Sequence, residues 1–275
     1  MLKRTITAAC MMAVFIPICI YSGTIIFNIT MSLLSLIAVY EMLSCVGAKK
    51  NIPVLAFSCL LGAAMPIIPY YTSVYTLHIE LVCYIVYMIL VFTLMVFSKG
   101  GEDFTTVSAA FMGVFYISVS FTAIVLLREK GAYLYLLAFF GPWVSDTFAY
   151  IVGRLIGKRK LIPEVSPNKT IAGSIGGIVA TAALFVVYGF VIAKYADISS
   201  TPNIIAMAIA GAIVSVISQI GDLTASYIKR RYGVKDYGKL FPGHGGVMDR
   251  FDSVLLTAPI LYIISSLPIV QGMLI

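Results

Sequence analysis

The sequence predicts an all-α, polytopic integral membrane protein: a helical bundle of about nine transmembrane helices. Of its 275 residues, 60% are hydrophobic and 11% are charged, and the mean hydropathy is +1.00. Soluble domains carry about 25% charged residues. The 19 Lys and Arg and the 12 Asp and Glu gather in short segments between long apolar stretches. This pattern excludes a soluble globular domain, a singly anchored protein and a secreted disulfide scaffold.

Nine apolar segments are long enough to cross a bilayer, for which about 20 residues are needed. The first follows Lys3 and Arg4 as in a signal peptide, but it lacks a convincing small-residue cleavage site, so we expect a retained helix. In the third, Pro66 and Pro69 mark either a broken helix or a loop. The expected spans are 5–21, 24–46, 52–71, 77–97, 104–127, 131–153, 171–193, 203–228 and 254–274.

The basic residues predict the orientation, because Lys and Arg concentrate in cytoplasmic loops. With a cytoplasmic N-terminus, sixteen of the nineteen basic residues fall in cytoplasmic segments, and only Arg128, Lys130 and Lys194 fall outside. We therefore expect the C-terminus outside, most simply in a bacterial cytoplasmic membrane. The net charge of +7 is explained by these loops, so we expect the lipid bilayer and no nucleic acid as a partner.

The domain organisation is predicted to be simple. No internal repeat or soluble domain interrupts the chain, so residues 1–275 are expected to form one membrane domain. Its variable N-terminal spans would occupy 1–130 and its catalytic half 131–275. Two long basic loops, 154–170 and 229–253, are punctuated by Gly and Pro, and chemistry is expected there.

An acidic residue in an apolar span is the first candidate. Asp146 stands between Ser145 and Thr147, and a carboxylate within the membrane is costly enough to indicate function. A polar contact between neighbouring helices is the alternative.

A phosphate cradle is the second candidate. Ser166, Lys169 and Thr170 precede an apolar span, where hydroxyl groups, free backbone amides and a lysine can surround a phosphate. An ordinary helix cap with a snorkelling lysine explains the same residues.

Carboxylates in the second long loop and in the span before it predict a metal site. Asp222 and Ser226 are four residues apart, and Asp249 and Asp252 are three apart, so each pair shares a face if its segment is helical. Oxygen ligands with few histidines favour Mg²⁺ over Zn²⁺. Together with Asp146, these carboxylates are our candidate Mg²⁺ ligands.

Basic side chains surround those carboxylates, and Lys229, Arg230, Lys235 and Arg250 are suited to phosphate groups. Between them, Gly243-His244-Gly245-Gly246 lets backbone amides approach a ligand, with His244 as a proton donor or a hydrogen-bond donor. A positive-inside loop neutralised by scattered aspartates would need neither this loop nor the aspartate spacing. These features indicate phosphoryl or nucleotidyl transfer between a phosphorylated lipid and a soluble phosphorylated substrate.

The spacing of these residues resembles a known signature. It runs Ser226-x-x-Lys229-Arg230-x-x-x-x-Lys235-Asp236 and continues Pro242-Gly243-His244-Gly245-Gly246-x-x-Asp249-Arg250-x-Asp252. This pattern is similar to that of the phosphatidate cytidylyltransferases, the CDP-diacylglycerol synthases, and the likeness covers roughly the C-terminal half. One departure is that Ile171-Ala172-Gly173 stands where the family usually has Trp-Glu-Gly, so no role is carried over for that glutamate.

The resemblance implies a Mg²⁺-dependent membrane enzyme that joins CTP and phosphatidic acid into CDP-diacylglycerol and pyrophosphate. Whether a second metal ion takes part is left open, and a homodimer is compatible with the sequence although no motif indicates it. On this basis the expected catalytic residues are Asp222, Asp249, Lys229 and Arg250. The expected substrate-binding residues are Ser166, Lys169, Thr170, Ser226, Arg230, Lys235 and His244. The expected metal ligands are Asp146, Asp222, Asp249 and Asp252.

Two other functions fit the same residues. A CTP-dependent kinase of a polyprenol or another lipid alcohol would transfer the γ-phosphoryl group and leave no cytidine in its product. A non-enzymatic lipid transporter or scaffold would use Asp146 and the basic loops only for binding, and would release no pyrophosphate.

Overall fold

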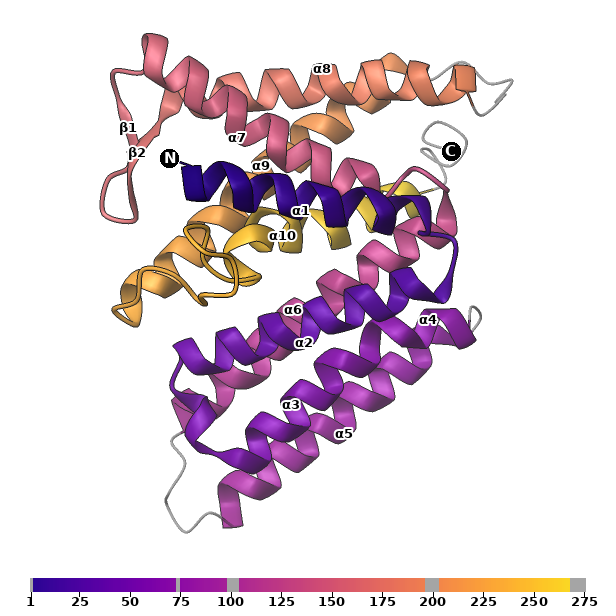
Figure 1. The fold of residues 1–275 in the computed structure, drawn as a ribbon, viewed down its shortest axis with the longest axis vertical. Coiled ribbons are helices and arrows are strands. Elements are labelled where there is room, and N and C mark those ends of the chain that lie inside the picture. Colours follow the sequence, from indigo (N-terminus) through magenta and orange to yellow (C-terminus); the bar gives the residue numbers. More distant parts are fainter. Residues whose placement is uncertain (1, 73–74, 98–103, 196–202, 268–275) are drawn as a thin grey trace. The chain divides into compact units, whose positions relative to one another are not determined.

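The computed structural model describes residues 2–72, 75–97, 104–195 and 203–267, and almost all of the regular structure is helical (Figure 1). The chain forms two compact units. Unit 1 contains residues 1–126 and 231–251, and unit 2 contains residues 127–230 and 252–275. Each unit is treated separately below.

Unit 1 is built from the N-terminal helices. They are α1 (Leu2–Ile20), α2 (Ile25–Cys45), the 3₁₀ turn η1 (Ala48–Lys50), α3 (Ile52–Ala64), the 3₁₀ turn η2 (Met65–Ile67), α4 (Ile68–Tyr71), α5 (Thr76–Phe97) and most of α6 (Phe104–Lys130). The pair Pro66 and Pro69 therefore breaks a helix rather than forming an open loop, because proline lacks the amide that the helix needs.

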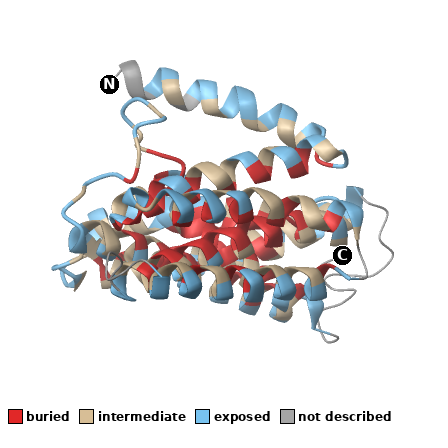
Figure 2. Cartoon of the chain, turned by 90° about the horizontal axis from the view of Figure 1, so that it is seen from below, coloured by how far each residue is buried: buried red, intermediate tan, exposed pale blue. Residues whose placement is uncertain are grey.

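The core of unit 1 lies around α2. Phe27, Met31 and Val39 of this helix are at most 2% exposed, and a β-carbon on Gly62 of α3 would lie only 2.8 Å from the Val39 side chain. Figure 2 shows buried residues among these packed helices, whereas none of the described side chains of α1 is buried. The small residue at position 62 thus lets α2 and α3 pack closely, as is common in membrane bundles.

Unit 2 contains the C-terminal helices and a small hairpin. The elements are α7 (Leu136–Ile156), β1 (Lys160–Ile162), β2 (Ser166–Thr170), α8 (Ile171–Tyr195), α9 (Ile204–Arg231) and α10 (Met248–Ser266), which begins in unit 1. β1 and β2 are antiparallel, with Lys160 opposite Thr170 and Ile162 opposite Ser166. Part of the predicted 154–170 loop is therefore a hairpin that leads directly into α8.

The fold class predicted from the sequence is confirmed: this is an all-α polytopic membrane protein. Each of the nine expected segments overlaps a helix, and seven helical segments in the described ranges are long and apolar enough to cross a membrane. They are α2, the combined α3 to α4 segment, α5, α6, α7, α8 and α9. Helices α1 and α10 are outside this set, and the end of the predicted span 254–274 lies outside the described residues. The total of nine spans therefore stays a prediction.

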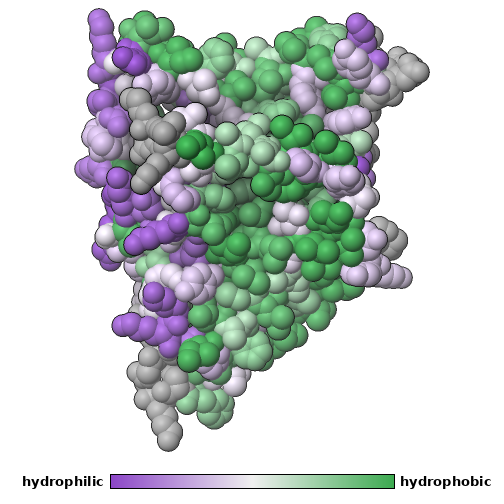
Figure 3. Space-filling view, in the orientation of Figure 1, coloured by the Kyte–Doolittle hydropathy of each residue, from purple (hydrophilic) through white to green (hydrophobic). Residues whose placement is uncertain are grey.

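The surface has the character that a bilayer requires. In Figure 3 hydrophobic side chains cover the lengths of the helices, and hydrophilic ones gather at helix ends and connecting segments. On α5, for example, Leu81, Val82 and Ile89 are each more than half exposed. Lipid can cover such residues without any protein partner.

Candidate active site

Polar side chains tie three helices of unit 2 together beside the predicted site. The hydroxyls of Ser145 on α7 and Ser215 on α9 are 2.8 Å apart and share a buried hydrogen bond. Ser174 on α8 donates to the Gln219 Oε1 at 2.5 Å, and Gln219 Nε2 donates back to the Ser174 carbonyl at 3.2 Å. These contacts hold α7, α8 and α9 together close to the predicted site, because Asp146 directly follows Ser145 and Asp222 comes three residues after Gln219.

Glycines bring α7 into close contact with β2 and with α8. A β-carbon on Gly153 would lie 2.8 Å from the Thr170 hydroxyl, and one on Gly177 would lie 2.8 Å from the Ser145 carbonyl oxygen. Thr170 is buried, and its hydroxyl accepts a hydrogen bond of 3.1 Å from the Gly173 amide. Thr170 is therefore a cap of helix α8, which matches the ordinary-cap alternative for this residue.

The adjacent Lys169 pairs with a carboxylate on another helix. Its ammonium group forms a salt bridge with Asp222 of α9, and the two side chains are 22% and 26% exposed. A lysine at the end of β2 is thus held against the acidic residue that the sequence predicts as a metal ligand. The remaining predicted residues of this hairpin and α9 are partly exposed or exposed, namely Ser166, Ser226, Lys229 and Arg230.

Asp252, in the first turns of α10, belongs to the same acidic group. A β-carbon on Gly221 would lie 2.7 Å from the Asp252 carbonyl oxygen, so α9 and α10 touch directly beside Asp222. Desolvation raises the pKa of Asp252 to about 7, and the carboxylates of Asp222 and Asp146 add to this rise. The Ser253 amide, which donates to Asp252 at 2.8 Å, and the positive charge of Lys229 act in the opposite direction. Three acidic residues therefore repel one another in unit 2.

The other part of the predicted site is the segment 232–247 of unit 1, which ends where α10 begins. Gly243 and Gly245 have φ values of 78° and 84°, and Phe241 and Gly245 form a β-bridge. Positive φ at these positions is accessible to glycine without strain. His244 is partly exposed within this turn, and Lys235 and Arg250 are exposed. The helical start of α10 confirms that Asp249 and Asp252 are one turn apart on a single helix.

Asp249 shapes this segment from within. Its Oδ2 accepts hydrogen bonds from the amides of Tyr237 at 2.8 Å and Gly246 at 3.0 Å, and the residue is 7% exposed. At least one carboxylate oxygen thus stabilises the loop by binding two backbone amides. This is a structural contribution in addition to the metal role that the sequence predicts.

The structure adds Glu41, a residue that the sequence analysis did not select. It lies on α2, is 5% exposed, and accepts hydrogen bonds from the amides of Val247 and Met248. A signal was available, because a glutamate within an apolar span indicates function in the same way as Asp146 does.

The fit of these groups to Mg²⁺ rests on the chemistry of the donors. In the described part of the chain, no three His, Cys, Asp or Glu side chains lie in an arrangement that could hold one metal ion. Nevertheless the carboxylates of Asp146 and Asp222 act on that of Asp252 as like charges, and their oxygen atoms are the ligands that Mg²⁺ prefers. A divalent cation would relieve that repulsion.

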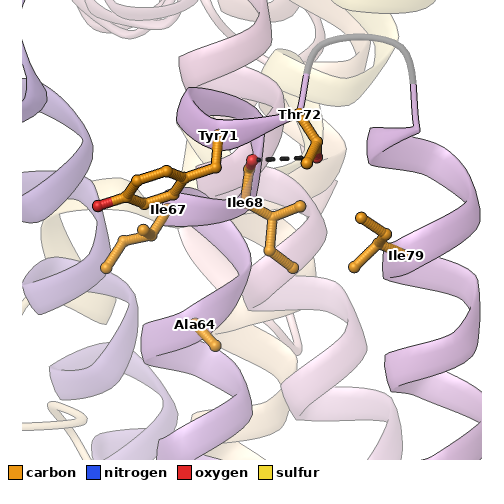
Figure 4. Close-up of a pocket in the computed structure, with 6 residues that line it drawn as sticks. All are labelled: Ala64, Ile67, Ile68, Tyr71, Thr72 and Ile79. Carbon is orange, nitrogen blue, oxygen red and sulfur yellow. Dashed lines mark hydrogen bonds between the residues drawn. The ribbon is translucent and has the colours of Figure 1, made fainter.

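A pocket elsewhere in unit 1 has a different character (Figure 4). It is lined by Ala64, Ile67, Ile68, Tyr71, Thr72 and Ile79. The Thr72 hydroxyl, which donates to the Ile68 carbonyl at 3.3 Å, is already engaged. With no charged lining residue, this pocket is unsuited to phosphate groups.

Comparison with known proteins agrees with the signature. The profile of the Cytidylyltransferase family matches residues 2–267. A protein of Staphylococcus haemolyticus (strain JCSC1435), named phosphatidate cytidylyltransferase, is 36% identical over 261 residues, which are 95% of this chain and 97% of the relative. Proteins of the same name from Staphylococcus epidermidis (strain ATCC 12228 / FDA PCI 1200) and Staphylococcus aureus (strain COL) are 34% and 33% identical over the same shares. The N-terminal spans are thus included in the similarity, and the chain belongs to the cytidylyltransferase family.

Proposed function

We propose that this membrane enzyme is a phosphatidate cytidylyltransferase that converts CTP and phosphatidic acid into CDP-diacylglycerol and pyrophosphate. A phosphate oxygen of the lipid attacks the α-phosphorus of CTP, and the bond from that phosphorus to the bridging oxygen of the β-phosphate breaks. Pyrophosphate leaves with the bonding electrons, so no protein nucleophile is required. The observation that carries the proposal is the similarity of nearly the whole chain to proteins of that name.

Cationic side chains would supply most of the stabilisation. Charge builds up on phosphate oxygens during the transfer, and fixed positive groups lower the barrier without moving. Lys169 and Lys229 in unit 2, with Lys235 and Arg250 in unit 1, are suited to this role. Arg250 can bind two phosphate oxygens at once because its guanidinium group is planar.

Mg²⁺ is the proposed cofactor, and it would supply positive charge next to the phosphates. Asp222 and Asp252 would hold it together with Asp146, and Asp249 stays a predicted ligand that also maintains its own loop in unit 1. Removal of divalent cations with EDTA is expected to abolish product formation, and added Mg²⁺ to restore it. Full activity in EDTA would contradict this assignment.

We also propose that the active-site segments face the cytoplasm of a bacterial cell. The distribution of sixteen of the nineteen basic residues supports an inside N-terminus and an outside C-terminus. CTP is a cytoplasmic nucleotide, so this orientation gives the soluble substrate access. Cysteine labelling from either side of sealed vesicles tests the orientation.

The function is tested with CTP that carries separate labels on cytosine and on the γ-phosphate. Detergent-purified protein is incubated with Mg²⁺ and phosphatidic acid, and a parallel reaction contains a polyprenol. Cytosine label in the lipid and γ-label in pyrophosphate are expected in the first reaction. A staphylococcal relative serves as the positive control.

The two rival functions give different results. γ-label in the polyprenol product would favour a lipid-alcohol kinase. If neither label moves while the positive control is active, a binding or transport role replaces catalysis.

A further inference from the structure

Glu41 caps a helix to which it is not adjacent in the sequence. The amide of Val247 donates to its Oε1 at 3.1 Å, and the amide of Met248 donates to its Oε2 at 2.9 Å. Met248 is the first residue of α10, and the first amides of a helix have no partner within the helix. A carboxylate from α2 therefore satisfies amides at the start of α10, where negative charge is favoured by the helix dipole.

Two glycines make room for this carboxylate. A β-carbon on Gly238 or on Gly246 would overlap the Glu41 carboxylate. Both glycines belong to the segment that leads into α10, so the carboxylate lies against the segment as well as against the helix start. Its burial in this position indicates that the contact is part of the fold rather than a surface encounter.

Asp249 binds the same segment. Its Oδ2 binds the amides of Tyr237 and Gly246, so the two acidic residues together bind four backbone amides. Buried carboxyl groups are stable at such a site only when hydrogen bonds compensate for the lost water. The conformation of the segment is therefore fixed by both.

We propose that Glu41 is a positioning residue for CTP: it fixes the segment 235–246 so that the segment's charged and amide groups meet the triphosphate. This inference rests on the proposed function. Glu41 is buried and does not need to touch the substrate, since it acts through the loop that it binds. It would connect the second helix of the chain to an active site whose signature lies more than 180 residues later.

The exposure of the segment favours CTP over the lipid as its ligand. Lys235, Pro242 and Gly243 are exposed, and the segment is outside the apolar spans. A soluble triphosphate can reach such a polar segment directly. Loss of the loop's alignment should therefore weaken CTP binding in particular, because misplaced binding groups lose much of their effect.

The test variant is Glu41→Gln, which preserves the side-chain shape. Glutamine has one acceptor oxygen, and its NH₂ group cannot accept from a backbone amide, so either Val247 or Met248 loses its partner. The expected result is a rise of at least tenfold in the KM for CTP at saturating phosphatidic acid, which corresponds to about 1.4 kcal/mol. Hydrogen exchange of the amides in 237–248 should be faster.

The matched control is Glu80→Gln on α5, in the same unit. Glu80 is partly buried, and one of its carboxylate oxygens is buried without a hydrogen-bond partner among the described residues. The same chemical change there should alter neither the KM for CTP nor the exchange of 237–248. If Glu41→Gln fails to fold, Gly238→Ala provides a second test, because its methyl group would displace the Glu41 carboxylate. The same rise in KM is expected.

A purely structural role predicts a different outcome. Loss of folded protein lowers the apparent kcat but leaves the KM of the remaining enzyme unchanged, and that result would overturn the proposal. Unchanged exchange of 237–248 in Glu41→Gln would also overturn it. A wild-type protein that makes no CDP-diacylglycerol would instead remove the proposed function, while the exchange measurement would still test whether Glu41 holds the loop.

Discussion

Replacement of Lys169 by methionine is the sharpest test of the acidic group in unit 2. The substitution preserves an unbranched side chain of similar length and removes the charge that pairs with Asp222. Asp222 is then left near Asp252 and Asp146 without this cation. We expect the carboxylates to move apart and the phosphate groups to lose a positive partner.

The size of the effect follows from charge and exposure. Two unit charges about 4 Å apart interact by about 4 kcal/mol at an effective dielectric constant of about 20. The side chains of Lys169 and Asp222 are 22% and 26% exposed, so solvent reduces this energy. We therefore expect the substitution to reduce the stabilisation of the transition state by about 1.5 to 2.5 kcal/mol. This corresponds to a decrease in kcat/KM of about 10- to 100-fold.

The assay is the initial rate of cytosine-label incorporation into lipid, at saturating phosphatidic acid and varied CTP. Lys160→Met is the control, because Lys160 is exposed on the other strand of the same hairpin and carries the same charge. If Lys169→Met retains activity within twofold of Lys160→Met, the salt bridge with Asp222 has no part in the reaction.

Three further predictions concern the neighbouring contacts. Gly221→Ala should lower kcat about tenfold and destabilise the protein by about 1 to 3 kcal/mol, because its methyl group would lie 2.7 Å from the Asp252 carbonyl oxygen. Activity assays and thermal melts measure the two effects, and wild-type values in both would contradict the close packing. Asp249→Asn should abolish cytidylyl transfer while the protein stays folded, and the control Lys50→Ala, in another basic segment, should change activity little. Retained activity in Asp249→Asn would remove Asp249 from the mechanism. Thr170→Val should lower the free energy of unfolding by about 1 kcal/mol through loss of the α8 cap, whereas Thr170→Ser should retain most of the cap's stabilisation. Equal melting temperatures of the two variants would show that the cap hydrogen bond contributes nothing.

Much of this fold could be predicted because the bilayer allows few solutions. Apolar length alone located the helices, whereas the sequence left open whether Asp249 and Asp252 lie on a helix, and the structure shows that α10 begins before both. The hairpin of Lys160 to Thr170 was not predicted, since its strands are short and lack an alternating apolar pattern. The polar spacing there was equally compatible with an irregular loop.

The contact of Glu41 with the start of α10 could not be derived from spacing. The glutamate and the Val247 amide are separated by 206 residues, and a hydrogen bond to a backbone amide leaves no trace in the identity of the donor residue. The sequence could indicate that a carboxylate on α2 needed a partner. Only the packing of unit 1 identifies which one.

The reciprocal bonds between Ser174 and Gln219 have a consequence for how α8 and α9 can move. Within hydrocarbon there is little water to replace a broken hydrogen bond, so a slide of one helix along the other by a single residue would cost both bonds at once. The two helices are therefore locked in register. Lys169 lies two residues before the start of α8, and Asp222 lies about one turn after Gln219. The fixed register therefore also fixes the position along the helices at which the cation and the carboxylate meet. We therefore expect these two helices to keep their register when substrate binds.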